Sequence, residues 1–113
     1  MAEFIEDLRA LIEVTPASTV STTVLTNEGV RIVLFSFDAG EELSEHTAAM
    51  PVLISVLDGA LSITASGATM ELRAGGVLSM ATREPHSVVA LEPTRMMLAM
   101  LDPRAKAAAS GTH

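Results

Sequence analysis

The fold is decided by residues 40–59, GEELSEHTAAMPVLISVLDG, in which a glycine turn, a polar segment and an aliphatic run follow one another. The aliphatic run, residues 51–57, is rich in Val, Leu and Ile and ends at Asp58-Gly59, a dipeptide typical of tight turns. A second segment of similar texture, residues 60–65, begins directly after that turn. Short apolar segments joined by tight turns predict antiparallel β-structure.

The same pattern of short apolar segments separated by turn residues continues on both sides of this stretch. Further short segments rich in β-branched and aliphatic side chains occupy residues 30–37, 70–73, 77–80, 86–91 and 94–101, with Gly, Pro, Asn or Asp between them. Many short strands at near-regular spacing predict an all-β sandwich or barrel. The last segment is apolar at successive positions, so we expect a strand that is buried on both faces or lies in a subunit interface.

The two ends of the chain have a different texture. Residues 2–13 place Phe4, Ile5, Leu8, Leu11 and Ile12 at helical spacing, which predicts a short amphipathic helix ending near Pro16. We expect it to cover one barrel end or a dimer seam; a partner-binding helix is the alternative. The predicted organisation is a helical or extended segment (1–16), a β-barrel (17–103) and a frayed Ala- and Ser-rich tail (104–113).

Composition limits the classes of function. The 113 residues suffice for one domain, and because hydrophobic residues make up 49% and aromatic residues 3%, the core must be aliphatic. A formal net charge of -7 without a Lys/Arg cluster argues against binding to nucleic acid or to anionic membranes. No cysteine is present, which excludes thiolate chemistry. The acidic start and the lack of a long apolar run predict a cytoplasmic protein.

Two of the three histidines, His46 and His86, lie inside the predicted β region. In a regular strand alternate side chains share a face, so Glu42, Ser44 and Ala48 would lie on the same face as His46. These positions, together with Glu84 near His86, are candidates for polar groups around a histidine pair.

The positions of the histidines resemble the two motifs of the cupin superfamily. The first motif has a Gly, five residues, a His, one residue, a second His, then a Glu and a Gly. This chain reads Gly40 and His46, with Ala48 at the second His position, Val52 at the Glu position, and Gly59. Three of the five positions of the first motif are therefore preserved.

The second motif has a Gly, five residues, a Pro, one residue, a Gly, two residues, a His, three residues and an Asn. This chain keeps its Gly and its His and differs at the other three positions, reading Gly75, Ala81, Arg83, His86 and Ala90. The resemblance spans residues 30–101 and implies a double-stranded β-helix, or jelly-roll barrel, of the single-domain RmlC-like type. It also implies a homodimer.

Cupin metal sites are built from three His and one Glu, so the resemblance implies that His46 and His86 are the two remaining ligands of a degenerate site. A divalent transition metal would need a third donor, for which Glu42, Ser44 and Glu84 are candidates. The resemblance also places the ligand pocket around this pair, with Ala48, Met50, Val52, Met80 and Arg83 as its further residues. Methionines near the histidines suit Cu(I) or, more simply, an adaptable apolar wall.

Three functions fit this sequence. The first is a cupin barrel that binds a small molecule of unknown identity through a reduced two-histidine site. The alternative is a cupin metalloenzyme, an isomerase or oxygenase, that uses His46, His86 and a further ligand. The third is a non-catalytic dimerisation or regulatory module. Arg83 could bind a ligand carboxylate at the pocket mouth or pair with a surface glutamate.

Overall fold

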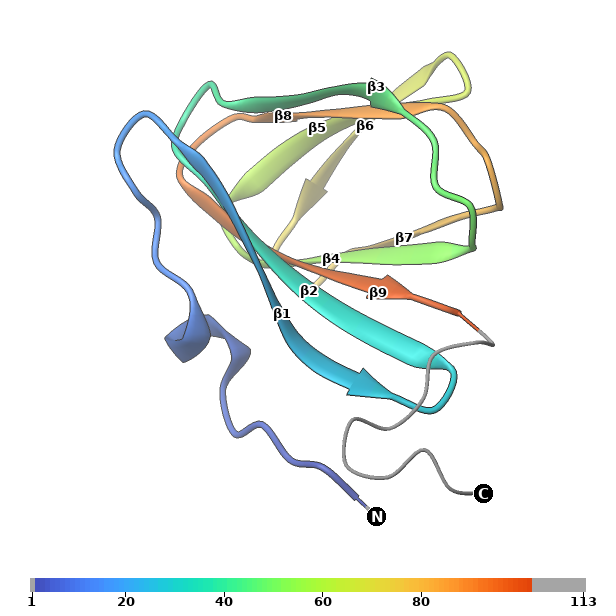
Figure 1. Ribbon diagram of the computed structural model, residues 1–113. Coiled ribbons are helices and arrows are strands. Elements are labelled where there is room, and N and C mark those ends of the chain that lie inside the picture. The colour runs from blue at the N-terminus through green and yellow to red at the C-terminus, as the bar shows by residue number, and fades with distance from the viewer. Residues whose placement is uncertain (1, 103–113) are drawn as a thin grey trace.

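The structure is a computed structural model that describes residues 2–102. Within this range a single turn of 3-10 helix, η1 (Leu8–Leu11), precedes nine β-strands (Figure 1). The strands are β1 (Thr19–Asn27), β2 (Val30–Phe37), β3 (Glu42–His46), β4 (Val52–Asp58), β5 (Ala60–Ala65), β6 (Ala68–Arg73), β7 (Val77–Met80), β8 (His86–Ala90) and β9 (Thr94–Met100). The expected all-β class is confirmed.

The strands form two antiparallel sheets that lie face to face (Figure 1). One sheet has five strands in the order β1-β2-β9-β4-β7, and the other has four in the order β3-β8-β5-β6. The chain passes from one sheet to the other after β2, β3, β4, β6, β7 and β8, so neither sheet is a simple meander. This is the jelly-roll barrel that the sequence predicts.

Seven of the nine strands within residues 2–102 begin and end within two residues of the predicted segments. Three strands, β2, β5 and β7, begin and end where the hydrophobic segments do. Two strands were not among the predicted segments: β1, which is rich in Thr, and β3, which is short and polar. In both, the residue types give no aliphatic run, so composition does not reveal them.

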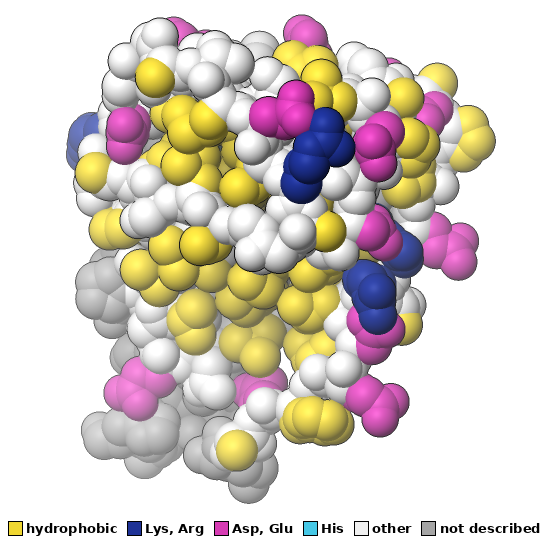
Figure 2. Space-filling model, turned by 180° about the vertical axis from the view of Figure 1, so that it is seen from behind, with side chains coloured by type: hydrophobic (Ala, Val, Ile, Leu, Met, Phe, Trp, Pro, Cys, Tyr) yellow, Lys and Arg dark blue, Asp and Glu magenta, His cyan; other side chains and the backbone are white. Residues whose placement is uncertain are grey.

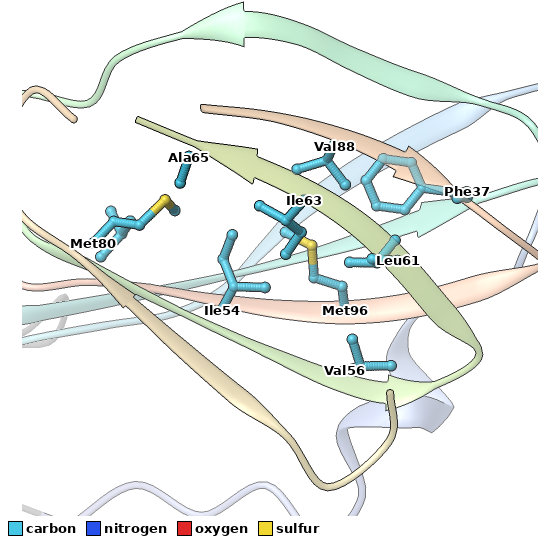
Figure 3. Packing of buried hydrophobic residues seen from close by; sticks show 11 residues of the cluster. Phe37, Ile54, Val56, Leu61, Ile63, Ala65, Met80, Val88 and Met96 are labelled. Atoms are coloured by element: carbon cyan, nitrogen blue, oxygen red, sulfur yellow. The ribbon is translucent and has the colours of Figure 1, made fainter. Parts of the chain in front are cut away.

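The core between the sheets is aliphatic, as expected from the scarcity of aromatic residues. Ile54 of β4, Leu61 and Ile63 of β5 and Met96 of β9 are all buried and pack against one another in one cluster (Figure 3). Phe37 closes one side of the cluster, and its ring stacks on that of Phe35 at a centroid distance of 6.1 Å. The two sheets are therefore held together mainly by burial of Val, Leu, Ile and Met side chains.

The predicted N-terminal helix over residues 2–13 is reduced to η1 alone. Asp7 caps this turn by accepting a hydrogen bond from the Arg9 backbone N–H, and the chain is extended again at Ile12. The carbonyl oxygens of Arg9 and Ile12 accept hydrogen bonds from Nη1 of Arg95, at 2.7 and 3.4 Å. A longer helix would use the Arg9 carbonyl internally, so this tertiary contact competes with helix propagation. We call residues 7–12 the N-terminal strap.

The outer face of the five-stranded sheet is also largely apolar and is partly exposed: Val77 is 65% exposed, whereas Leu34 and Ala99 on the same face are buried. The strand register places four apolar side chains on the face opposite the core: Ile32 of β2, Met97 of β9, Leu53 of β4 and Val77 of β7. Seen from behind, hydrophobic side chains gather in the lower half of the molecule, where this sheet lies (Figure 2). The outer face of the other sheet carries Ser62, Glu71 and Glu42 instead.

Two further expectations concern the ends and the membrane. The predicted tail, residues 104–113, lies outside the described residues. Between residues 2 and 102, no helix has the length and apolar character needed to span a bilayer.

Candidate functional site

A cavity of about 190 Å³ lies between the two sheets at one end of the barrel. Its wall is apolar except for two imidazoles: the lining residues are Phe35, Leu43, His46, Ala48, Val52, Ile54, His86, Val88, Met96, Leu98 and Met100. A mainly apolar hollow with a few convergent polar groups is the usual form of a small-molecule site.

The histidines meet because strands β3 and β8 are antiparallel partners. His46 ends β3 and His86 begins β8, and the register sets them directly opposite one another. Their ring centroids are 4.2 Å apart and the ring planes are inclined by 62°. His86 is 5% exposed, whereas His46 is exposed at the rim of the cavity. We call this rim the mouth.

A β-bulge in β3 turns His46 towards the cavity. Leu43 pairs with Val88 and His46 pairs with His86, so three steps along β3 match two steps along β8. One extra residue in β3 therefore allows Leu43 and His46 to line the same cavity. The expectation that Glu42 and Ser44 share a face with His46 is wrong, because it assumed regular alternation through the bulge.

Both histidines are held in the same way by the backbone. Nδ1 of His46 is 2.7 Å from the carbonyl oxygen of Ser44, and Nδ1 of His86 is 2.9 Å from that of Glu84. A carbonyl oxygen can only accept, so each Nδ1 must carry the hydrogen. In a neutral ring this leaves the lone pair on Nε2, and no group within residues 2–102 forms a hydrogen bond with either Nε2. Two ring nitrogens are thus left for a ligand.

The other predicted pocket residues divide into two groups. Ala48 and Val52 line the cavity, in place of the second histidine and the glutamate of the cupin motif. Met50 and Met80 are not among the lining residues, and Met80 is buried in the main core near Ala65 (Figure 3). Met80 is the register partner of Val52 and lies on the same face of the sheet, but it packs into the main core, so sequence proximity to a histidine did not separate core from cavity.

Arg83 does not line the cavity, but its backbone is bound to a residue that does. Its N–H donates to the carbonyl oxygen of Ala48 at 2.7 Å, and the side chain is exposed. Its φ of 63° lies in the left-handed region. Arg83 stands at a glycine position of the cupin motif, and this conformation is the reason that glycine suits the position.

Glu84 is engaged in holding the turn before β8. Its carboxylate accepts hydrogen bonds from Oγ of Ser66 at 2.8 Å and from the Ala81 N–H at 3.1 Å. The hydrogen bond from Ser66, followed by that from Ala81, holds the pKa of Glu84 below its ordinary value. The carboxylate of Glu84 is therefore bound to Ser66 and Ala81 and holds the turn together.

The residues present do not fit the four-ligand metal site of the cupin motif. Among residues 2–102, no group of three or more His, Asp or Glu side chains is arranged to hold a metal ion. The histidine pair supplies two imidazole nitrogens, and the other two motif positions carry Ala48 and Val52, which cannot coordinate. Divalent transition metals in proteins generally require three or four such donors.

Several cavity residues were not predicted as pocket residues. The clearest are Met96, Leu98 and Met100 of β9, which alternate along one face of the strand. Their period of two is present in the sequence, but Met97 and Ala99 between them are also apolar and conceal it. The two sets of side chains serve different purposes, the cavity on one face and the outer sheet surface on the other.

Comparison with solved structures identifies the fold. A cupin superfamily protein from Desulfitobacterium hafniense is 26% identical, with a TM-score of 0.80, over 90% of this chain and 94% of that chain. An RmlC-like cupin from Desulfovibrio desulfuricans is also 26% identical, with a TM-score of 0.77, over 89% of this chain and 97% of that chain. A variant of salicylate 1,2-dioxygenase from Pseudoaminobacter salicylatoxidans shares the fold at 16% identity and a TM-score of 0.71, over 90% of this chain and 34% of that chain.

The scan of protein-family models and the search of the curated proteins gave no match. The assignment therefore depends on the two-sheet topology and on solved neighbours that align over nearly their whole length. On this basis the chain is a small protein with the double-stranded β-helix of the RmlC-like cupin superfamily.

Proposed function

We propose that this protein binds a small, mainly apolar molecule in the barrel cavity, with Nε2 of His46 and Nε2 of His86 as its polar contacts. The observation that carries the proposal is the cavity itself: an apolar wall interrupted only by two imidazoles whose Nδ1 atoms are already bound. An apolar body gains from burial against the wall, and the ring nitrogens fix its orientation.

The volume limits the size of the ligand. At about 190 Å³ the cavity is somewhat larger than an engineered apolar cavity of about 150 Å³ that takes up benzene. We therefore expect a ligand of roughly six to ten non-hydrogen atoms. Larger metabolites such as nucleotides would have to lie mostly outside the barrel.

A pair of alanine variants tests the proposal. Ala48→Leu adds three carbon atoms to the cavity wall, whereas Ala49→Leu makes the same change at the next, exposed position. Small organic molecules within this size range would be screened by thermal shift and ligand-detected NMR against wild type and both variants. We expect hits that bind wild type and Ala49→Leu and lose binding to Ala48→Leu.

Two results would contradict the proposal. Hits that bind all three proteins equally do not occupy the cavity. No hit across a library that samples acids, amides, alcohols and amines of this size would show that the cavity does not act as a binding site.

The alternative function is a metalloenzyme that uses the same histidines. It is favoured by one observation, because metal-ligating histidines usually donate their second ring N–H to a carbonyl or carboxylate, as both rings do here. It lacks a third protein ligand among the described residues. Elemental analysis of protein purified without chelator, compared with His86→Ala, separates the two: near-stoichiometric metal that is lost in the variant favours the metalloenzyme.

The proposal includes a homodimer and a cytoplasmic location. The apolar outer face of the five-stranded sheet supports the first, since exposed apolar faces commonly mark association surfaces. The cysteine-free composition is compatible with the second.

A further inference from the structure

The five arginines of residues 2–102 fall into two groups. Three form ion pairs: Arg9 with Asp7, Arg73 with Glu71, and Arg95 with Asp58. For Arg31 and Arg83, no ion pair and no side-chain hydrogen bond forms within the described part of the chain. The chain has fourteen acidic side chains against seven Lys and Arg, so a shortage of carboxylates does not explain this.

Both of these arginines are attached to the wall of the cavity. Arg31 of β2 is the register partner of Met100, which lines the cavity. Directly opposed residues share a face, so Arg31 lies on the inner face of its sheet. Arg83 is tied through its N–H to the carbonyl oxygen of Ala48, another lining residue.

The charge of the cavity favours an anion over a cation. None of the lining residues is acidic, so a buried ammonium group would have no counter-charge. The backbones of Arg31 and Arg83 lie next to lining residues, and guanidinium groups bind carboxylates through two parallel hydrogen bonds. Apart from Phe35 and the two imidazoles the wall is aliphatic, so no lining residue would offset a second charge on the ligand.

We propose that the ligand is a small hydrophobic monocarboxylate, with its hydrocarbon body in the cavity and its carboxylate at the mouth between Arg31 and Arg83. This inference rests on the proposed binding function and adds the chemical class. Arg31 and Arg83 determine the specificity for the acid, while His46, at the mouth, and His86 remain the polar contacts of the proposed binding function.

The test uses three probes with one carbon skeleton: cyclohexanecarboxylate, cyclohexanecarboxamide and cyclohexylmethylamine. Titration calorimetry with the full chain should show that the acid binds about tenfold more tightly than the amide, and that the amine does not bind. Arg31→Gln and Arg83→Gln should each weaken binding of the acid by about threefold to tenfold and leave that of the amide unchanged. Arg73→Gln, which removes the same charge on β6, should have no effect on either.

The outcomes separate this inference from the proposed function. Equal binding of the acid and the amide, or binding of the acid that is insensitive to both arginine variants, overturns the monocarboxylate proposal and leaves the binding cavity in place. Failure of all probes and of the wider library overturns the proposed function as well. Thermal unfolding of each variant verifies that a loss of binding is not a loss of fold, and the amide serves as a second control.

Discussion

Gly59 illustrates how strongly one residue can constrain this barrel. It lies in the turn between β4 and β5 with a φ of 98°, a conformation that side chains with a Cβ rarely adopt. A Cβ at this position would lie 2.3 Å from Oγ1 of Thr94 and 2.5 Å from the carbonyl oxygen of Pro93. Thr94 is itself fully buried and its hydroxyl bonds to the backbone of Ala60, so it has no space to move.

We therefore predict that Gly59→Ala lowers the free energy of unfolding by about 3 kcal/mol or more, because backbone strain and steric overlap add. Gly67→Ala is the matched control: its φ of 83° imposes similar strain, but no atom lies within 4 Å of the added Cβ. It should cost only about 1–2 kcal/mol. Urea denaturation of both variants measures the difference, and equal losses would contradict the role given to Thr94.

The sequence predicted one part of this arrangement. The Asp58-Gly59 dipeptide indicated a tight turn between two apolar segments, which is confirmed. The contact with Thr94 joins positions that are far apart in the chain, and no local pattern contains that information. The same holds for Arg31, whose position beside the cavity follows only from its register with Met100.

At the scale of elements, the turn between β7 and β8 positions the histidine pair. Glu84 contributes its carbonyl to His86 and its carboxylate to Ser66 and Ala81, so one residue orients the ring and closes the turn. Since the pKa of Glu84 is lower in the folded state than in the unfolded chain, the ionised carboxylate stabilises the fold. This stabilisation is present above the unfolded pKa and is lost as the pH falls through the folded value.

We predict that the Glu84→Gln variant loses less free energy of unfolding than wild type between neutral pH and about pH 3. The amide cannot be titrated, so its hydrogen bonds do not change over this range. Denaturant midpoints at several pH values would measure the slope, with the exposed Glu92→Gln as the control for a general change in charge. An unchanged slope in Glu84→Gln would contradict the prediction.

A second element, the N-terminal strap, is held by Arg95. The guanidinium binds the carboxylate of Asp58, with Nε to Oδ2 at 3.0 Å, and the carbonyl oxygens of Arg9 and Ile12. Arg95→Gln should therefore release the strap, with a loss of about 1 kcal/mol in stability and faster tryptic cleavage after Arg9. Arg73→Gln removes an exposed ion pair of the same kind and should leave cleavage at Arg9 unchanged.

Elements differ in how far sequence alone predicts them. Aliphatic segments such as β2 and β5 were located to the residue, because burial of β-branched and aliphatic side chains is what makes them strands. The helical spacing of residues 2–13 gave a helix where only η1 exists, because the Arg95 contact prevails over local propensity. The bulge in β3 was not predictable, since its polar residues carry no periodicity.

The whole molecule presents two unlike outer faces. The five-stranded sheet carries apolar side chains outward, including Val77, which is 65% exposed, whereas the four-stranded sheet is mainly polar. The strand expected to lie in a subunit interface, β9, is central in its sheet, so it has no free edge for strand exchange. Association of two copies would instead use the outer face of that sheet.

We predict a homodimer in solution that Val77→Lys converts towards monomer, because a buried charge without a partner opposes association. Val89→Lys places the same change on the outer face of the other sheet, opposite Ser62, and should leave the dimer intact. Light scattering coupled to size-exclusion chromatography measures both. A monomeric wild type, or equal effects of the two substitutions, would contradict the prediction.

Strand β9 lies between the cavity and the outer face of the five-stranded sheet. Met96, Leu98 and Met100 line the cavity, while Met97 and Ala99 lie on the opposite face, so a single strand separates the cavity from the other side of the sheet. Close-packed interiors transmit small displacements, and such a thin wall has no second layer to absorb them. Filling the cavity should therefore slow amide hydrogen exchange along β9. A change of packing inside the barrel would then also alter the outer face of the five-stranded sheet.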